Sequence, residues 1–349
     1  MKIIKSILPT VIGDVAVYNI INNNRASVKI SSLGAGIISI FVPDKNGDFD
    51  DVVLGYSKIS DYINDKACAG KTPGRYANRI SKGKFTINGK SYQLSLNDFP
   101  NSLHGGNIGF ANKLWDSKIE DKSILFTLYS EDGDEYYPGN LIVKVRYEWN
   151  ENNELIIGFE AKCDMQTIVN LTNHAYFNLA GENSGSILNH KLQLFASQYL
   201  PVDESFIPTG EYLQVKNTPM DFREPMKIGD GLKTKFDVLE HSRGYNHCWV
   251  VDNWIKDKLK KIAILSDTKS GRVLEIETTQ PSVQVYTGNY LNGSPINKSG
   301  RSYNDYDGIA IECQGMPDAP NHSNFPSQLL REEETYHQII KYKFKTVIN

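Results

Sequence analysis

One polar segment in the middle of the chain carries more hydrogen-bonding side chains than a strand needs. In "TIVNLTNHAYFNLAG" (167–181), His174, Tyr176 and four further polar residues lie among apolar ones. Burying polar groups without partners costs on the order of several kcal/mol, so the segment is either a ligand site or a fully satisfied polar network. The other polar residues of this run are Asn170, Thr172, Asn173 and Asn178.

A second segment places a carboxylate where a proton could be exchanged. In "YDGIAIECQGMPDAPNH" (306–322), the residues from Gly308 to Ile311 predict a short apolar strand with Glu312 at its end. Apolar surroundings raise the pKa of a carboxyl group toward the range that suits a general base. A salt-bridged residue at a sheet edge is the structural alternative.

Two glycine-rich loops add hydrogen-bonding groups. The loop "GKTPGRYANRI" supplies Arg75, Asn78 and Arg79, which in a solvated loop would be ordinary surface residues. The loop "NSLHGGN" supplies His104 before two glycines, which let the backbone turn sharply and leave space for a ligand beside the imidazole. Each signal alone is modest, and a turn without function explains either loop. Their combination with the polar segment 167–181 and a possible general base at Glu312 is specific.

Strands predominate among the elements that must hold these residues. In "NLIVKVRYEW", every second residue from Leu141 to Trp149 is apolar, while charged residues share the other face. "KFTINGKSYQLSL" predicts a tight hairpin, because Asn88 and Gly89 accept the positive φ angles of a type I′ turn. Strand pairs are also predicted at 15–33, 140–163, 261–279 and 339–348, and short helices at 57–64 and 325–334.

Nothing in the sequence divides the chain. Its 349 residues contain no Pro- or Ser-rich linker, no shift in composition and no evident repeat, so we expect one domain spanning 1–349. Strands in this number must stack or close on themselves. The sequence therefore predicts an all-β fold, a single large β-sandwich with few short helices.

Charge and cysteine content limit the partners and the compartment. The 38 basic and 41 acidic residues give a formal net charge of −3, without a basic block that could follow nucleic acid or an anionic membrane. The four cysteines form no CxxC pair and are typical of reduced thiols. The N-terminus lacks a signal-peptide pattern, and no apolar run approaches the ~20 residues of a membrane helix. We expect a soluble, cytoplasmic protein.

Five strings occur in the order and at the separations of a known family. They are "GRYANRI", "LHGG", "TNHAYFNLAG", "VQVYTGNY" and "IECQGMPDAPNH". From about residue 15 to the C-terminus, the chain closely resembles the aldose 1-epimerases, also called galactose mutarotases, and "TNHAYFNL" and "ECQGMPDAPN" are highly specific to them. The resemblance implies a galactose mutarotase-like, single-domain β-supersandwich.

The resemblance also implies roles for individual residues. Glu312 corresponds to the general base and His174 to the general acid of the family. Arg75 matches a motif, but no ligand role transfers to it. No metal or other cofactor is implied. The sugar-binding positions are Asn78, Arg79, His104, Tyr176, Gln284 and Asn246.

Asn246 is the point at which the chain departs from the family. The family has an aspartate before the histidine of this segment, whereas "GYNHCWVVD" has Asn246 before His247. An amide offers one acceptor and two neutral donors where a carboxylate offers acceptors and a charge. A natural variant tuned to another hydroxyl pattern, an engineered change and a weakened enzyme are all compatible with this difference. His247 itself is expected in the core or behind the site.

The predicted function is that of an isomerase, an aldose 1-epimerase that interconverts the α and β anomers of free aldohexoses such as glucose and galactose. We expect a monomer or homodimer whose partner is a small sugar, with no nucleic acid or membrane. Three alternatives remain: a metal site at His104, His174 and Glu312, a sugar-binding protein without activity, and an epimerase for another aldose or a hexose 6-phosphate. A phosphate would favour more clustered arginines.

Overall fold

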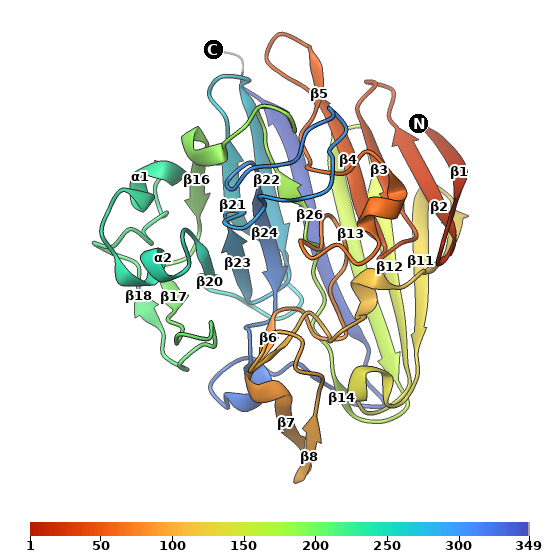
Figure 1. The fold of residues 1–349 in the computed structure, drawn as a ribbon, viewed down its shortest axis with the longest axis vertical. Helices are drawn as coiled ribbons and strands as arrows, with labels where there is room; N and C mark the ends of the chain where they lie inside the picture. The colour runs from red at the N-terminus through yellow and green to blue at the C-terminus, as the bar shows by residue number, and fades with distance from the viewer. Residues whose placement is uncertain (348–349) are drawn as a thin grey trace.

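Antiparallel strands make up most of the regular structure of the protein. The computed structural model describes residues 1–347. Its strands form three large sheets and three two-stranded sheets. Figure 1 shows the long strands side by side, with the two short helices at one edge of the molecule. The prediction of an all-β fold with few helices is confirmed.

The largest sheet has nine strands and contains two of the predicted hairpins. The pair predicted at 140–163 is confirmed as β12 and β13, which pair from Leu141 with Cys163 to Trp149 with Leu155. The pair predicted at 261–279 is β21 and β22. In order across the sheet, the strands are β10 (Asp116–Glu120), β11 (Ser123–Ser130), β12 (Leu141–Trp149), β13 (Glu154–Cys163), β26 (Tyr336–Thr346), β22 (Arg272–Thr278), β21 (Lys260–Ser266), β16 (Lys191–Leu194) and β19 (Met226–Lys227).

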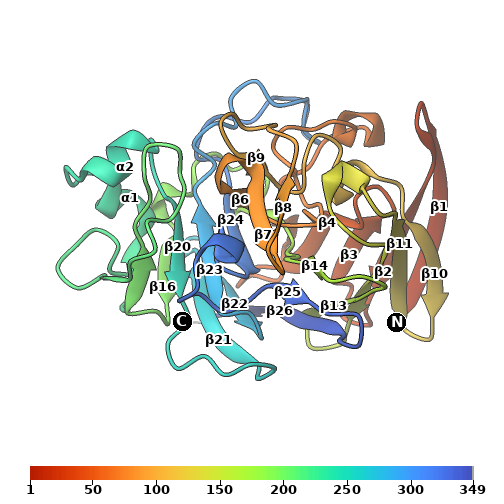
Figure 2. The same cartoon turned by 90° about the horizontal axis from the view of Figure 1, so that it is seen from below.

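Two further sheets form the layer opposite the nine-stranded sheet. They are connected where Val53 bridges to Phe177 and the Leu54 N–H donates to the Tyr176 carbonyl at 2.9 Å. In Figure 2, β21, β22 and β26 lie on one side, and β24, β4 and β3 on the other. The five-stranded sheet is β1 (Lys2–Thr10), β2 (Gly13–Ile21), β3 (Ser27–Ser31), β4 (Gly36–Pro43) and β5 (Phe49–Asp51). The six-stranded sheet is β15 (Tyr176–Phe177), β24 (Ile309–Gln314), β23 (Ser282–Tyr286), β20 (Asn246–Val250), β17 (Gln198–Leu200) and β18 (Leu213–Gln214).

One continuous apolar cluster fills the space between the layers. It includes Ile30 from β3, Phe126 from β11, Tyr342 from β26 and Ile311 from β24, all of them almost completely buried. Burial of this apolar surface is the main favourable term in folding. The core thus contacts all three large sheets, and β24 packs against it through side chains such as Ile311.

Smaller elements decorate the two layers. The two-stranded sheets pair β6 (Arg79–Ile80) with β9 (Ser102–Leu103), β7 (Lys84–Ile87) with β8 (Lys90–Gln93), and β14 (Thr167–Ile168) with β25 (Leu329–Leu330). The α-helices are α1 (Ile228–Leu232) and α2 (Asp237–His241). Single 3₁₀ turns occur at Ile59–Tyr62, Ser81–Gly83, Phe110–Asn112, Asp134–Tyr136, Ile187–Asn189 and Ala319–Asn321.

Three local predictions need correction. The helix predicted at 325–334 is wrong, because Leu329 and Leu330 pair with β14 as β25 and Leu330 is buried. The helix predicted at 57–64 is reduced to one 3₁₀ turn. The segment 339–348 is not a strand pair but part of the single strand β26, which lies between β13 and β22; residue 348 is outside the described part.

Other local predictions are confirmed. The strand pair at 15–33 is β2 and β3. The tight hairpin is β7 and β8, and Asn88 and Gly89 have φ angles of 50° and 77°. Within residues 1–347, no helix is both long and apolar enough to cross a bilayer. All four cysteines are free and buried.

Gly70 and Gly89 provide a matched test of how closely the backbone is packed near His174. Their φ angles are 74° and 77°. A Cβ on Gly70 would lie 1.9 Å from the Ile37 carbonyl oxygen, whereas one on Gly89 would have no neighbour within 4 Å. We expect Gly89→Ala to lower the free energy of unfolding by about 1–2 kcal/mol, the cost of left-handed backbone, and Gly70→Ala by more than about 4 kcal/mol. Denaturant unfolding measures both, and equal losses would contradict the crowding at Gly70.

Candidate active site

The alternation of side chains along the central strands separates site residues from core residues. Trp249 on β20 and Ile311 on β24 point into the apolar core. Because successive side chains of a strand face opposite ways, Asn246, Gln284 and Glu312 lie on the other face of the sheet. Three strands therefore present polar groups to one side while their apolar residues anchor them on the other.

Glu312 is the carboxylate that β24 presents on this polar face of the sheet. It lies in the middle of β24, not at the strand end that the sequence predicts, because the strand continues to Gln314. It is opposite Gln284 in the ladder and only 2% exposed. Burial raises the pKa of Glu312, although the positive charges of His174 and Arg79 oppose the rise.

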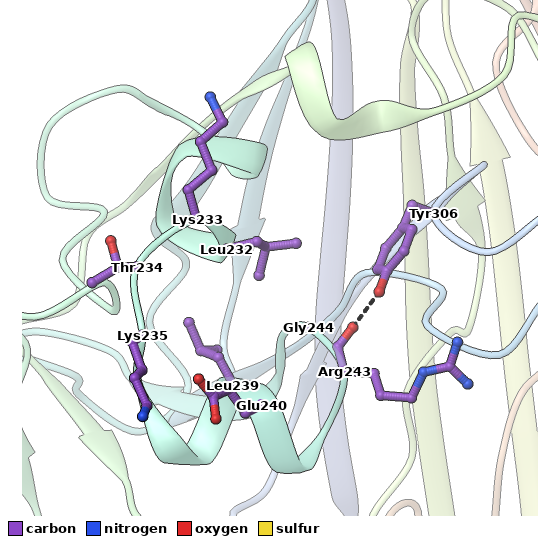
Figure 3. Close-up of a pocket in the computed structure, with 9 residues that line it drawn as sticks. All are labelled: Leu232, Lys233, Thr234, Lys235, Leu239, Glu240, Arg243, Gly244 and Tyr306. Atoms are coloured by element: carbon purple, nitrogen blue, oxygen red, sulfur yellow. Dashed lines mark hydrogen bonds between the residues drawn. The ribbon is translucent and has the colours of Figure 1, made fainter.

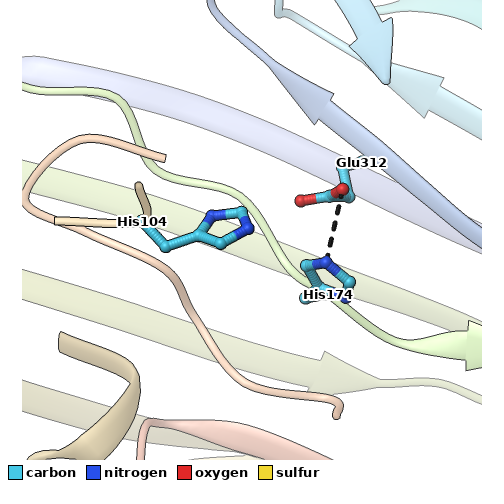
Figure 4. Close-up of side chains that lie close together, drawn as sticks. All are labelled: His104, His174 and Glu312. Carbon is cyan, nitrogen blue, oxygen red and sulfur yellow. Dashed lines mark ion pairs between the residues drawn. The ribbon is translucent and has the colours of Figure 1, made fainter. Parts of the chain in front are cut away.

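His174 lies directly beside Glu312, and strand register explains why. Tyr176 pairs with Ala310 between β15 and β24. Extending this antiparallel register by two residues brings His174 opposite Glu312. The His174 Nε2 atom is 3.5 Å from Glu312 Oε1, and both side chains are buried (Figure 4). Within the described chain, His174 Nδ1 and Glu312 Oε2 have no protein hydrogen-bond partner.

His104 enters the same space from the loop after β9. Its ring points toward His174 and Glu312 in Figure 4. The Asn78 backbone N–H donates to His104 Nδ1 at 3.2 Å, which leaves the Nε2 atom to carry the proton of the neutral ring. Burial, together with His174 and Arg79, holds the pKa of His104 well below its ordinary value of 6.5. His104 is therefore a neutral donor at pH 7.

Arg79 supplies a positive charge at the wall of the pocket, which Lys66 also lines. Its Nε donates to Asp98 Oδ2 at 2.7 Å, and the guanidinium lies 5.1 Å from the centre of the Phe206 ring. Among residues 1–347, this guanidinium hydrogen bonds only through Nε. The ion pair and the aromatic ring fix the side chain while the terminal nitrogens remain available to a ligand.

Asn246 and Gln284 form an amide pair on neighbouring strands. The Gln284 Nε2 donates to Asn246 Oδ1 at 2.8 Å. This bond orients the amide, so that the Asn246 Nδ2 is the donor left for the pocket. The adjacent His247 faces the core instead. It is fully buried against Trp249, and burial lowers its pKa to about 4.

Tyr176 lies next to His174 as a neutral phenol. Its hydroxyl donates to the Ala67 carbonyl at 3.0 Å, and its ring centre is 5.0 Å from that of His174. Burial raises the pKa of Tyr176 well above its usual range. The oxygen therefore remains protonated and can accept a hydrogen bond from a ligand hydroxyl.

These side chains surround one pocket of about 470 Å³. Gln284 does not line it but orients Asn246 from behind. The other seven predicted site residues all line it, namely Asn78, Arg79, His104, His174, Tyr176, Asn246 and Glu312.

Sequence reasoning missed several residues of this pocket. Tyr286 lines it, and the alternation along β23 from Gln284 was a signal that could have found it. Tyr290, the last residue of the string "VQVYTGNY", also lines it, whereas Asp98 and Phe206 come from loops that no pattern connected to the site. Only the fold brings these loops together.

Other polar residues of the quoted motifs are structural. The Arg75 guanidinium is buried and donates to the carbonyls of Pro138 and Gly139, and burial lowers its pKa to about 10. In the segment 167–181, the ligand site and the polar network coexist. His174 and Tyr176 face the pocket, while the fully or almost fully buried amides that hydrogen bond to backbone are Asn170, Asn173 and Asn178.

A second pocket, of about 480 Å³, lies by the two helices (Figure 3). Its charged residues are of both signs, with Lys233, Lys235 and Arg243 near Glu240. None of the predicted site residues lines it. The predicted site residues His174 and Glu312 lie in the other pocket.

The same three residues could also hold a metal ion. One potential ligand atom from each of His104, His174 and Glu312 lies within 4.8 Å of the other two. Two imidazoles and a carboxylate form a set that binds divalent metals in other proteins. The arrangement is thus chemically able either to exchange protons with a polar ligand or to coordinate a cation.

Comparisons with known proteins identify the family of the chain. The family model "Aldose 1-epimerase" matches residues 16–343. The chain is 41% identical to a galactose mutarotase of Rattus norvegicus over 93% of this chain and 92% of the rat protein. It is 36% identical to the aldose 1-epimerase of Escherichia coli K12 over 93% of each chain.

Solved structures show the same likeness. The structure of an aldose epimerase homologue from C. elegans superimposes with a TM-score of 0.87 at 30% identity, over 99% of this chain and 100% of that one. The family model, the relatives and this superposition each extend over more than nine-tenths of the chain. The chain therefore belongs to the aldose 1-epimerase family, which its sequence motifs resemble.

Proposed function

We propose that this protein is an aldose 1-epimerase that interconverts the α and β anomers of free aldohexoses, with Glu312 as general base and His174 as general acid. The observation that carries the proposal is the buried pair of His174 Nε2 and Glu312 Oε1 at 3.5 Å. The two oxygens that exchange protons in this reaction are both bonded to C1 of the sugar. An acid and a base that serve them must therefore be close neighbours, as these two are.

The proposed reaction is a balanced transfer of two protons. The Glu312 carboxylate accepts the proton of the C1 hydroxyl, the C1 hydroxyl oxygen forms the carbonyl, the bond from C1 to the ring oxygen breaks, and the His174 imidazolium donates a proton to that oxygen. The open aldehyde then rotates about the C1–C2 bond. Closure reverses both transfers and yields the other anomer. General acid and base terms are each worth ~10²- to 10⁴-fold in rate.

The remaining pocket residues are proposed to bind the sugar hydroxyls. Arg79, neutral His104 and the Asn246 amide supply donors, and the Tyr176 hydroxyl supplies an acceptor. Asn78 positions His104 through its backbone N–H. Gln284 acts on the ligand through the orientation of Asn246.

The charge of the pocket supports a neutral sugar over a hexose 6-phosphate. A phosphate favours several converging guanidinium groups. Among the described residues, Arg79 is the one arginine that lines this pocket, where it is paired with Asp98, and Lys66 adds a single ammonium group. The continuous core further supports one domain over 1–349, and the four free cysteines support a cytoplasmic location. We keep the proposal of a monomer or homodimer without nucleic-acid or membrane partners.

Variants of the acid and the base test this assignment. We expect the purified protein to accelerate the optical-rotation change of freshly dissolved α-glucose or α-galactose. His174→Ala and Glu312→Gln should each lose ~10²-fold or more of that rate, because each removes one proton-transfer group. Glu312→Gln should unfold at the same temperature as the wild type or higher, since it relieves a buried charge.

Two outcomes would contradict the proposal. Near-normal polarimetric rates in either folded variant would exclude the residue from the chemistry. The metal site is the second candidate, favoured by the closeness of the three ligand atoms. Loss of wild-type activity after EDTA treatment, restored by a divalent cation, would establish it in place of metal-free proton transfer; we expect full activity after chelation.

The pH dependence should report the raised pKa of Glu312. The base must be ionised to accept a proton, so kcat/KM falls as pH drops through this pKa. Burial raises the pKa above its ordinary value of 4.5, which places the acidic limb above pH 4.5. Polarimetry between about pH 4 and pH 8 measures this limb. A midpoint at or below 4.5 would contradict the burial effect.

Asn246→Asp tests the departure from the family. An aspartate still accepts the hydrogen bond from Gln284 and replaces the free amide donor with a charged acceptor. A charged hydrogen bond is worth roughly 1–2 kcal/mol more than a neutral one, so we expect kcat/KM on glucose or galactose to rise about tenfold. Asn246→Ala is the control and should lower the same constant. An unchanged or lower value for Asn246→Asp would show that this site uses the amide.

A further inference from the structure

Asn170 is a fully buried amide four residues before His174. Its Nδ2 donates to the Ala77 carbonyl at 3.0 Å and to the Gly315 carbonyl at 3.3 Å. Its Oδ1 accepts from the Gly315 N–H at 2.8 Å. Its backbone carbonyl also accepts a hydrogen bond from the Ala77 N–H at 2.8 Å. All hydrogen-bonding atoms of the side chain are thus engaged with two other segments of the chain.

These two segments are the ones that carry the other site residues. Ala77 directly precedes Asn78 and Arg79. Gly315 follows Glu312 by three residues. One amide therefore connects the segment of the proposed acid, the strand of the proposed base and the loop of the proposed sugar-binding residues.

The hydrogen bonds of Asn170 lie where the strand ladder ends. β15 and β24 pair only at Tyr176 and Phe177, on one side of the acid–base pair. The backbone N–H and carbonyl of His174 are bonded to Lys71 and Gly70, not to the strand of Glu312. On the other side of the pair, the side chain of Asn170 holds Gly315. His174 and Glu312 therefore lie between the short β15–β24 ladder on one side and the hydrogen bonds of the Asn170 side chain on the other.

We infer that Asn170 is a positioning residue that sets the distance between the His174 imidazole and the Glu312 carboxylate. The inference rests on the proposed function for its catalytic consequence, but its structural part concerns only that distance. Acid and base must meet the substrate in a fixed geometry, and misplacement by about 1 Å can cost ~10²-fold in rate. Asn170 acts through the backbones that carry the two groups and does not touch the sugar.

Asn178 offers a matched control within the same polar segment. It is also fully buried, its Nδ2 donates to the carbonyls of Gly185 at 2.6 Å and Asp307 at 2.9 Å, and its Oδ1 accepts from the Ala180 N–H at 3.1 Å. The number and type of bonds equal those of the Asn170 side chain. Asn178 also joins the His174 segment to the chain before β24, but the Tyr176–Ala310 and Phe177–Ile309 pairs of the ladder lie between these bonds and the pair of His174 and Glu312.

The test compares Asn170→Asp with Asn178→Asp. Both substitutions keep the side-chain size and remove the amide donors. We expect similar losses of stability, but only Asn170→Asp should lower kcat, by ~10²-fold with KM changed less than about twofold. Crystal structures of both variants should show a wider separation of His174 Nε2 and Glu312 Oε1 in Asn170→Asp alone. If Asn170→Asp does not fold, Asn170→Ser, which introduces no carboxyl group, replaces it.

Each outcome decides the inference. An unchanged acid–base separation in the Asn170 variant, or equal losses of kcat in both variants, would overturn it and leave Asn170 a general stabilising residue. A wild type without mutarotase activity would contradict the proposed function instead. In that case, the separation measured in the variant crystals still confirms or rejects the positioning role.

Discussion

The burial of one carboxylate is the constraint on which this structure depends. Glu312 is almost completely enclosed, and an ionised carboxylate loses its hydration at such a site. The nearby imidazole of His174 compensates in part, and so does the charge of Arg79. Both can do so only if the two segments that carry them stay in place beside β24. The two packed layers and their common core provide that rigidity.

The irregular segments around the site are held by side chains where ladders are missing. Buried asparagines bond to backbone groups that neither helix nor sheet satisfies, and Arg75 does the same for the carbonyls near Pro138. The side-chain amides of Asn170, Asn173 and Asn178 have partners for both polar atoms. Arg75 Nε and Thr172 Oγ1 have none among the described residues. The motif 167–181 thus combines two kinds of polar residue: amides that join the backbone, and the His174 and Tyr176 side chains that face the pocket.

Prediction from sequence succeeded where the signal is local. Alternating hydrophobicity located β12, β13, β21 and β22, and the Asn-Gly turn located the β7–β8 hairpin, because period-two patterns and positive φ angles are properties of neighbouring residues. It failed at 325–334, where the pairing of Leu329 and Leu330 with a distant strand decided the conformation. Most of the pocket came from motifs, whereas the loops bearing Asp98 and Phe206 carry no signal that links them to it.

The sequence by itself determined which residues could act and which way many of them face. Strand alternation alone sends Asn246 to one side of β20 and His247 to the other, because successive side chains must oppose each other. Only the tertiary structure decided that His247 is a buried core residue, that Gln284 orients Asn246, and that His174 stands 3.5 Å from Glu312. Distances and burial arise from contacts between segments far apart in the chain, and these contacts exist only once the sheets have packed.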